Sequence, residues 1–274
     1  MIQDGIIGKV REIHVWSDRP WNGWAQGEDR PQGTPPVPAG LDWDLWLGPA
    51  PERPYHPAYL PGRWRMWQEF GTGALGDMGC HTMNLAAWAL NLKDPTSVEA
   101  ESFPMNDETY PKWSIVRWAF PARGELPPVN LTWYDGWAHG GKRPPREWLD
   151  GNQATKSGAA LIGEEGTFYQ TNDVGTSWML LPEDKFRDNK DVAAITEATR
   201  GVDHHQEWIA ACKGGPPAKS HFEYAARLTE TALLGNVALR LGERVHWDEE
   251  KMRARGCPEA ETLINRPYRD GWSL

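Results

Sequence analysis

The spacing of apolar residues predicts a series of short strands. Runs rich in β-branched and aromatic residues, bounded by Pro-rich or Gly-rich turns, are typical of strands. Such runs lie at 9–16, 97–103, 113–120, 129–134, 159–162, 167–170 and 177–181. From residue 97 onward they follow one another without a helix between them, which favours an antiparallel sheet over parallel βαβ units.

Apolar residues return at helical spacing in other parts of the chain. Residues 71–92 predict one helix with a mostly apolar face, and residues 203–213 and 223–241 predict two more that end at glycines. Short helices are also expected at 41–47 and near 249–255. Strands grouped in the middle and helices grouped in the last third indicate an α+β domain.

Residues 17–70 have a different character, because they combine many prolines with many aromatic residues. Ten prolines lie between Pro20 and Pro61, which excludes a long helix or a central strand. Long loops of this kind are usually functional or disordered, and the aromatic content argues against disorder. Residues 1–8 have the pattern of the last turn of a helix that stops at Gly5.

Composition narrows the possible partners. The 274 residues carry a net charge of −9 without a basic run, so nucleic acid is a poor candidate, since phosphate binding needs clustered Lys or Arg. No stretch reaches the ~20 apolar residues of a membrane span. Cys80, Cys212 and Cys257 are too few and too far apart for a disulfide framework, and we expect inert thiols. The 17 Trp outnumber Phe and Tyr together, which favours flat apolar surfaces with a polar edge.

A glycine-rich segment, Gly71 to Gly76, matches the G-x-G-x-x-G pattern of dinucleotide-binding units. That pattern needs a buried strand directly before it and an acidic residue at the end of a second strand about 20 residues on. Residues 63–70 are charged and aromatic instead, and Asp94 lies in a turn before Pro95. The sequence therefore favours close packing at a helix start over a dinucleotide site.

Asp77 and His81 are four residues apart on the predicted helix, so they share one face and can contact each other. A carboxylate beside an imidazole fixes the tautomer of the ring and favours its protonated form, which suits a general acid or base near neutral pH. The alternative is an Asp that caps the helix start and a structural His. Glycines at 76 and 79 open the same turn to a ligand and favour the functional interpretation.

The segment at 64–84, WRMWQEFGTGALGDMGCHTMN, resembles the start of the second domain of the Gfo/Idh/MocA family of NAD(P)-dependent oxidoreductases. Further segments resemble the same bacterial type of domain: IGKVREIHVWSDRP at 7–20, IGEEGTFYQ at 162–170, HHQEWIAACKGG at 204–215, FEYAARLTETALLGNVALRLGERVHWD at 222–248 and PYRDGW at 267–272. Nearly the whole chain is covered.

The resemblance implies a predominantly antiparallel, open-faced sheet with helices on one side, like the C-terminal domain of glyceraldehyde-3-phosphate dehydrogenase. It also implies oxidation of a sugar or polyol hydroxyl to a ketone, with hydride transfer to C4 of a nicotinamide. By the motif match, His81 takes the proton-transfer role and Asp77 the orienting role. A homo-oligomer through the exposed sheet face is expected from the family as well.

The chain departs from the family pattern at its beginning. Family members start with a Rossmann domain that holds NAD or NADP and ends in a Glu-Lys-Pro motif, and this chain contains no such motif. We therefore expect residues 1–8 to be a remnant of the linker helix and 9–274 to be the substrate-binding and oligomerisation domain. We expect this chain alone to lack tight cofactor binding and turnover, and its cofactor-binding residues are unknown.

Aromatic residues before the predicted helix are candidates for substrate binding. Trp64, Arg65 and Trp67 can form a stacking surface for a sugar ring, with the guanidinium donating to hydroxyls or to a carboxylate. Packing within the scaffold is the alternative for each Trp. Tyr134 and Asp135 end a strand and can hydrogen-bond hydroxyls, with simple turn chemistry as the alternative.

His204 and His205 are the last candidates. Together with His81 and Asp77 they could form a zinc-like set of ligands, but neighbouring helix residues point about 100° apart, so both rarely bind one ion. We therefore predict no metal. Two positions are consistent with the sequence: one of the two histidines lines the substrate cleft, or both lie on the helix surface.

Four functions are consistent with these residues. The first is the substrate domain of a sugar or polyol dehydrogenase, and the second is a glycosidase that acts on glycosides by transient oxidation with the same Asp77 and His81. The third is a non-catalytic protein that binds carbohydrate or assists assembly through the Trp-rich loop. The fourth is a zinc hydrolase. The compartment cannot be read from this sequence.

Overall fold

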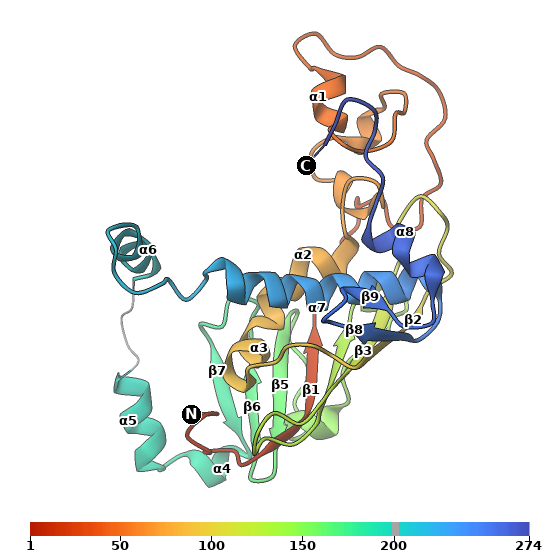
Figure 1. Ribbon diagram of the computed structural model, residues 1–274. Coiled ribbons are helices and arrows are strands. Elements are labelled where there is room, and N and C mark those ends of the chain that lie inside the picture. The colour runs from red at the N-terminus through yellow and green to blue at the C-terminus, as the bar shows by residue number, and fades with distance from the viewer. Residues whose placement is uncertain (199–202, 274) are drawn as a thin grey trace.

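The computed structural model describes residues 1–198 and 203–273, and these form two layers (Figure 1). One layer is a sheet in the order β7-β6-β5-β1-β4-β3-β2-β8-β9. The second layer consists of the long helix α7 with α2 and α3, which lie across one face of the sheet (Figure 1). The predicted α+β class and the open-faced sheet are confirmed.

The first seven strands follow the predicted positions closely, and the last two were not predicted. Their bounds are β1 Val10–Trp16, β2 Ser97–Ser102, β3 Ser114–Phe120, β4 Val129–Tyr134, β5 Gly158–Gly163, β6 Thr167–Gln170, β7 Trp178–Leu181, β8 Val245–Asp248 and β9 Arg253–Ala254. Strand β9 lies where a short helix near 249–255 was expected, and that prediction is wrong. The segment turns back so that Trp247 pairs with Ala254 in an antiparallel ladder.

The helices agree in part with those predicted from the sequence. Their bounds are α1 Trp43–Leu47, α2 Gly73–Thr82, α3 Asn84–Leu90, α4 Glu183–Phe186, α5 Lys190–Ala198, α6 His204–Cys212, α7 Phe222–Leu241 and α8 Glu261–Ile264. The continuous helix expected at 71–92 breaks at Met83, which ends α2 and begins α3. Residues 1–8 form hydrogen-bonded turns with Gly5 at a positive φ of 76°, instead of a regular helical turn.

One pair of strands is parallel. β1 lies between β4 and β5, and it runs parallel to β4 with Ile13 opposite Leu131, whereas its pairing with β5 is antiparallel. All other ladders of the described residues are antiparallel. The pairing joins residues more than 100 positions apart, and local apolar spacing carries no information about such a partner.

The main core lies between the sheet and the helical layer. Val15 and Trp118 of the sheet, Leu75 of α2 and Leu234 of α7 are buried in it. Gly235 brings α7 close to both neighbours, because a Cβ there would lie 2.6 Å from Leu75 Cδ2 and 2.6 Å from Trp118 Cζ2. Helix α2 is therefore held at a fixed height above the sheet.

The opposite face of the sheet mixes polar and aromatic side chains. His14 faces Thr132 across the ladder, and Thr132 faces Arg117. The Nδ1 atom of His14 lies 2.9 Å from the hydroxyl of Tyr134, and burial lowers the pKa of His14 to about 4. Trp148, in the loop after β4, stacks on the His14 ring. The Arg117 side chain on the same face remains 41% exposed.

Substitution Gly235→Ala tests how closely the two layers approach. An alanine usually stabilises a helix interior by up to about 1 kcal/mol relative to glycine. Here the added methyl group overlaps Leu75 and Trp118, so we expect a net loss of about 1–3 kcal/mol in the free energy of unfolding. Denaturant unfolding measures it, and a variant more stable than the wild type would contradict this packing.

Candidate functional site

Helix α2 starts against the end of the Pro-rich segment. Arg65 belongs to a 3-10 helix at Trp64–Met66, so no strand precedes the glycine-rich segment. A Cβ on Gly71 would lie 2.3 Å from the carbonyl oxygen of Arg65, which shows that the absent side chain makes room for the protein's own backbone. Gly71 thus serves the close approach of two backbone segments, in agreement with the packing interpretation.

Asp77 is bound by Arg65, whose Nε donates to Asp77 Oδ1 at 2.9 Å. The same guanidinium lies 5.5 Å from the ring centre of Trp24 and 5.2 Å from that of Trp64. Among the described interactions there is no hydrogen bond or ion pair between Asp77 and His81. The expected contact across one helical turn is therefore not made here, because the carboxylate turns toward Arg65.

His81 lies one turn further along α2, on its exposed side. It lines a cavity of about 430 Å³ between α2, α3 and the region of β6 and the turn that follows it, together with Trp88, Gln170 and Asp173. The ring is thus accessible from solvent beside hydrogen-bonding groups. An accessible imidazole is what a proton-transfer group requires.

The two predicted stacking tryptophans have different surroundings. Trp64 is 36% exposed. Trp67 is fully buried, donates from Nε1 to the carbonyl oxygen of Ala58 at 3.0 Å, and packs edge-to-face on Tyr59. The structure leaves no face of Trp67 for a sugar ring, so its placement as a substrate-binding residue is corrected to the scaffold alternative.

Tyr134 and Asp135 have internal partners as well. Asp135 accepts hydrogen bonds from the backbone N–H and the hydroxyl of Ser114 and from Nε1 of Trp133. Burial nevertheless raises the pKa of Asp135 to about 7, because desolvation of the charged form outweighs these bonds. The Tyr134 hydroxyl contacts His14. Both side chains are buried, so they hold the end of β4 rather than face a ligand.

His204 and His205 begin α6, which stands away from α2 beyond the start of α7 (Figure 1). Both are exposed, and their ring nitrogens come close to Asp203. Neither Asp77 nor His81 belongs to this group, which is the one cluster of possible metal ligands among the described residues. The structure does not bring these histidines to the site on α2.

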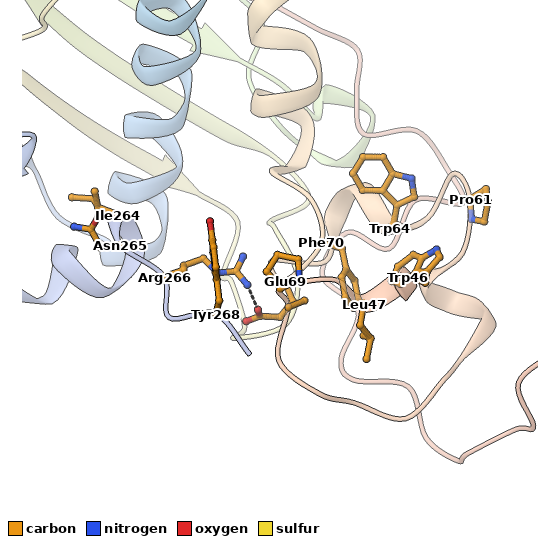
Figure 2. Close-up of a pocket in the computed structure, with 12 residues that line it drawn as sticks. Trp46, Leu47, Pro61, Trp64, Glu69, Phe70, Ile264, Asn265, Arg266 and Tyr268 are labelled. Carbon is orange, nitrogen blue, oxygen red and sulfur yellow. Dashed lines mark hydrogen bonds and ion pairs between the residues drawn. The ribbon is translucent and has the colours of Figure 1, made fainter. Parts of the chain in front are cut away.

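Residues near the C-terminus approach the Pro-rich segment and were not predicted as part of a site. Arg266 forms an ion pair with Glu69, and Tyr268 lines the same cavity as Trp46 and Trp64 (Figure 2). Local spacing does not show that residues 264–268 meet residues 46–70. The only signal was the PYRDGW tail at 267–272, which resembles the family without indicating a contact.

Asp135 makes the stability of the fold depend on pH. Its pKa is about 7 in the folded chain and near 3.8 in the unfolded chain. The folded state therefore keeps a proton that the unfolded state releases, and the resulting stability is present below about pH 4 and lost as the pH rises through 7. Asp135→Asn, which stays neutral, should become more stable relative to wild type between pH 4 and pH 8.

Urea unfolding at several pH values measures this difference, with the exposed Asp188→Asn as matched control. A constant difference between Asp135→Asn and wild type over this pH range would show that Asp135 does not hold the proton.

Comparison with known proteins finds a family match for the first part of the chain. Residues 1–124 match the family model described as "Oxidoreductase family, C-terminal alpha/beta domain" of the Gfo/Idh/MocA group. No curated protein matches the sequence. No helix among residues 1–198 and 203–273 is long and apolar enough to cross a bilayer.

Two solved structures are similar to this chain. The WlbA dehydrogenase from Chromobacterium violaceum, solved with NADH and UDP-GlcNAcA, has 13% identity and a TM-score of 0.52 over 90% of this chain and 57% of its own. The WlbA dehydrogenase from Bordetella pertussis, solved with the same two molecules, has 12% identity and a TM-score of 0.49 over 90% of this chain and 58% of its own. This chain thus spans less than two thirds of either protein. Residues 1–124 are thus similar to the C-terminal alpha/beta domain of the Gfo/Idh/MocA oxidoreductases.

Proposed function

We propose that this chain is the substrate-binding part of an NAD(P)-dependent oxidoreductase that converts a sugar or polyol hydroxyl to a ketone. The observation that carries the proposal is the family match over residues 1–124, which includes the helix with Asp77 and His81. The accessible ring of His81 beside a cavity supports the same chemistry.

His81 and Asp77 would have different tasks in this reaction. Oxidation of an alcohol removes a hydride from carbon and a proton from oxygen. We assign the proton to His81, whose exposed imidazole can accept it. Asp77 is fixed by Arg65, so the pair presents an acceptor and donors at defined positions, which is suited to holding neighbouring hydroxyls.

The glycine-rich turn of this chain does not have the surroundings of a dinucleotide site. The glycine-rich turn has its space filled by the Arg65 backbone, and it follows a 3-10 helix rather than a strand. The hydride acceptor would therefore have to be held by a separate nucleotide-binding domain, and we propose that this chain alone has no tight affinity for NAD or NADP.

The open face of the sheet is our proposed oligomer surface. His14, Thr132 and Arg117 form a row across three strands there, and the Arg117 side chain is 41% exposed. A second copy of the chain would cover the exposed part of this face. Sheet faces that combine aromatic and polar groups suit such association.

Reconstitution with a nucleotide-binding domain tests the proposed reaction. A Rossmann domain from the family, fused before Met1, should allow reduction of NAD or NADP with a sugar or polyol. His81→Ala should lower this rate by roughly 10²–10⁴-fold, because a general base contributes about that much. Production of NADH or NADPH, followed by absorbance, is the measurement, and Trp208→Ala on α6 is the control.

Two results would contradict the proposal. The first is micromolar binding of NAD or NADP to the unfused chain in a fluorescence titration, since the cofactor would then have a site here. The second is a folded and active fusion protein whose rate is unchanged in His81→Ala.

A further inference from the structure

A cavity of about 760 Å³ lies between the Pro-rich segment and the C-terminal tail (Figure 2). This volume falls within the range of about 300–1,000 Å³ that is typical of small-molecule pockets. It is distinct from the cavity beside His81, because the two have no lining residue in common. Of its lining residues, only Trp64 was a substrate-binding candidate in the sequence.

Aromatic side chains stand on both sides of this cavity. Trp64 is 36% exposed and Tyr268 is 42% exposed, so parts of both rings are available to a ligand. Trp46 is fixed between partners: it stacks on Trp43 at a ring distance of 4.9 Å and meets Phe70 edge-to-face at 4.8 Å. Half-exposed aromatic rings on a rigid support bind flat apolar surfaces, such as the C–H face of a sugar.

Charged groups at this cavity balance each other. Glu69 and Arg266 are the two charged residues that line it, and they are joined in an ion pair. In Figure 2, Glu69 lies between Tyr268 and the side that carries Trp46 and Trp64. A carboxylate and a guanidinium side by side offer acceptors and donors at neutral total charge, which matches vicinal hydroxyls better than a carboxylate or phosphate.

The C-terminal tail is anchored independently of the cavity. Arg269 forms an ion pair with Asp44 and donates to the carbonyl oxygen of Gly48, and its backbone N–H donates to the carbonyl oxygen of Pro49 at 3.2 Å. These bonds connect the tail to the segment around α1. Tyr268 and Arg266 are thereby held opposite Trp64 before any ligand arrives, which lowers the entropic cost of binding.

From these observations we propose that this cavity binds an uncharged sugar ring, stacked on Trp64 and Tyr268 and hydrogen-bonded by Glu69 and Arg266. The sugar class rests on the proposed function. Arg65 connects the two regions, because its guanidinium lies over the Trp64 ring and also binds Asp77. The cavity would thus hold a sugar unit next to the one presented to α2.

Calorimetric titration of this chain with methyl β-D-glucopyranoside at millimolar concentrations tests the proposal. We expect measurable binding that is weakened roughly tenfold in Trp64→Ala, through loss of the stacking surface. Trp208→Ala removes a tryptophan that is 62% exposed outside the cavity, and it should leave binding unchanged.

Glu69→Gln gives a second readout that a merely structural role would not produce. This variant leaves the charge of Arg266 without its partner, so we expect weaker binding of the neutral glucoside and stronger binding of methyl β-D-glucuronoside. Circular dichroism and thermal unfolding show that each variant is folded.

Three outcomes would overturn the inference: no binding of the neutral glucoside, equal loss in Trp64→Ala and Trp208→Ala, or loss in His81→Ala without loss in Trp64→Ala. The proposed reaction fails on different evidence, namely on hydride transfer in the fusion protein.

Discussion

The position of helix α2 depends on two close contacts at glycines. At each of them, neighbouring atoms lie where the Cβ of any other residue would be. On one side Gly235 of α7 lets Leu75 and the sheet residue Trp118 approach, and on the other Gly71 receives the carbonyl group of Arg65. Together they fix the height and the starting point of α2. Because Asp77 and His81 lie on this helix, the same contacts determine where both groups are presented.

The Pro-rich segment surrounds the start of α2, whereas the sheet and α7 hold the helix in place. Prolines keep this segment out of the sheet, so its order comes from aromatic packing around Trp67 and Tyr59 and from the ion pair of buried Arg53 with Glu108. The bound Arg65 then connects the segment to Asp77. Tryptophan rings thus lie beside paired charges, such as Arg65 with Asp77 and Arg266 with Glu69.

Apolar spacing in the sequence predicts strands and helices better than it predicts which of them pair or pack together. Apolar spacing gave the strands from 97 to 181 and helix α7, because these signals are local. It did not give the parallel pairing of β1 with β4 or the meeting of Arg266 with Glu69, since both join distant residues. Burial separates the candidate site residues into two groups. Trp67 and Asp135 are structural, because their polar atoms form hydrogen bonds within the protein. Trp64 and His81 line cavities and are accessible.

The indole N–H signals of the 17 tryptophans offer the most direct test of where a sugar binds. In a ¹H–¹⁵N spectrum, addition of methyl β-D-glucopyranoside should shift the signals of Trp46 and Trp64, which line the cavity. The signals of buried Trp16 and Trp118 should stay in place. Shifts confined to Trp208 on α6, or no shift at Trp64, would contradict a sugar site between the Pro-rich segment and the C-terminal tail.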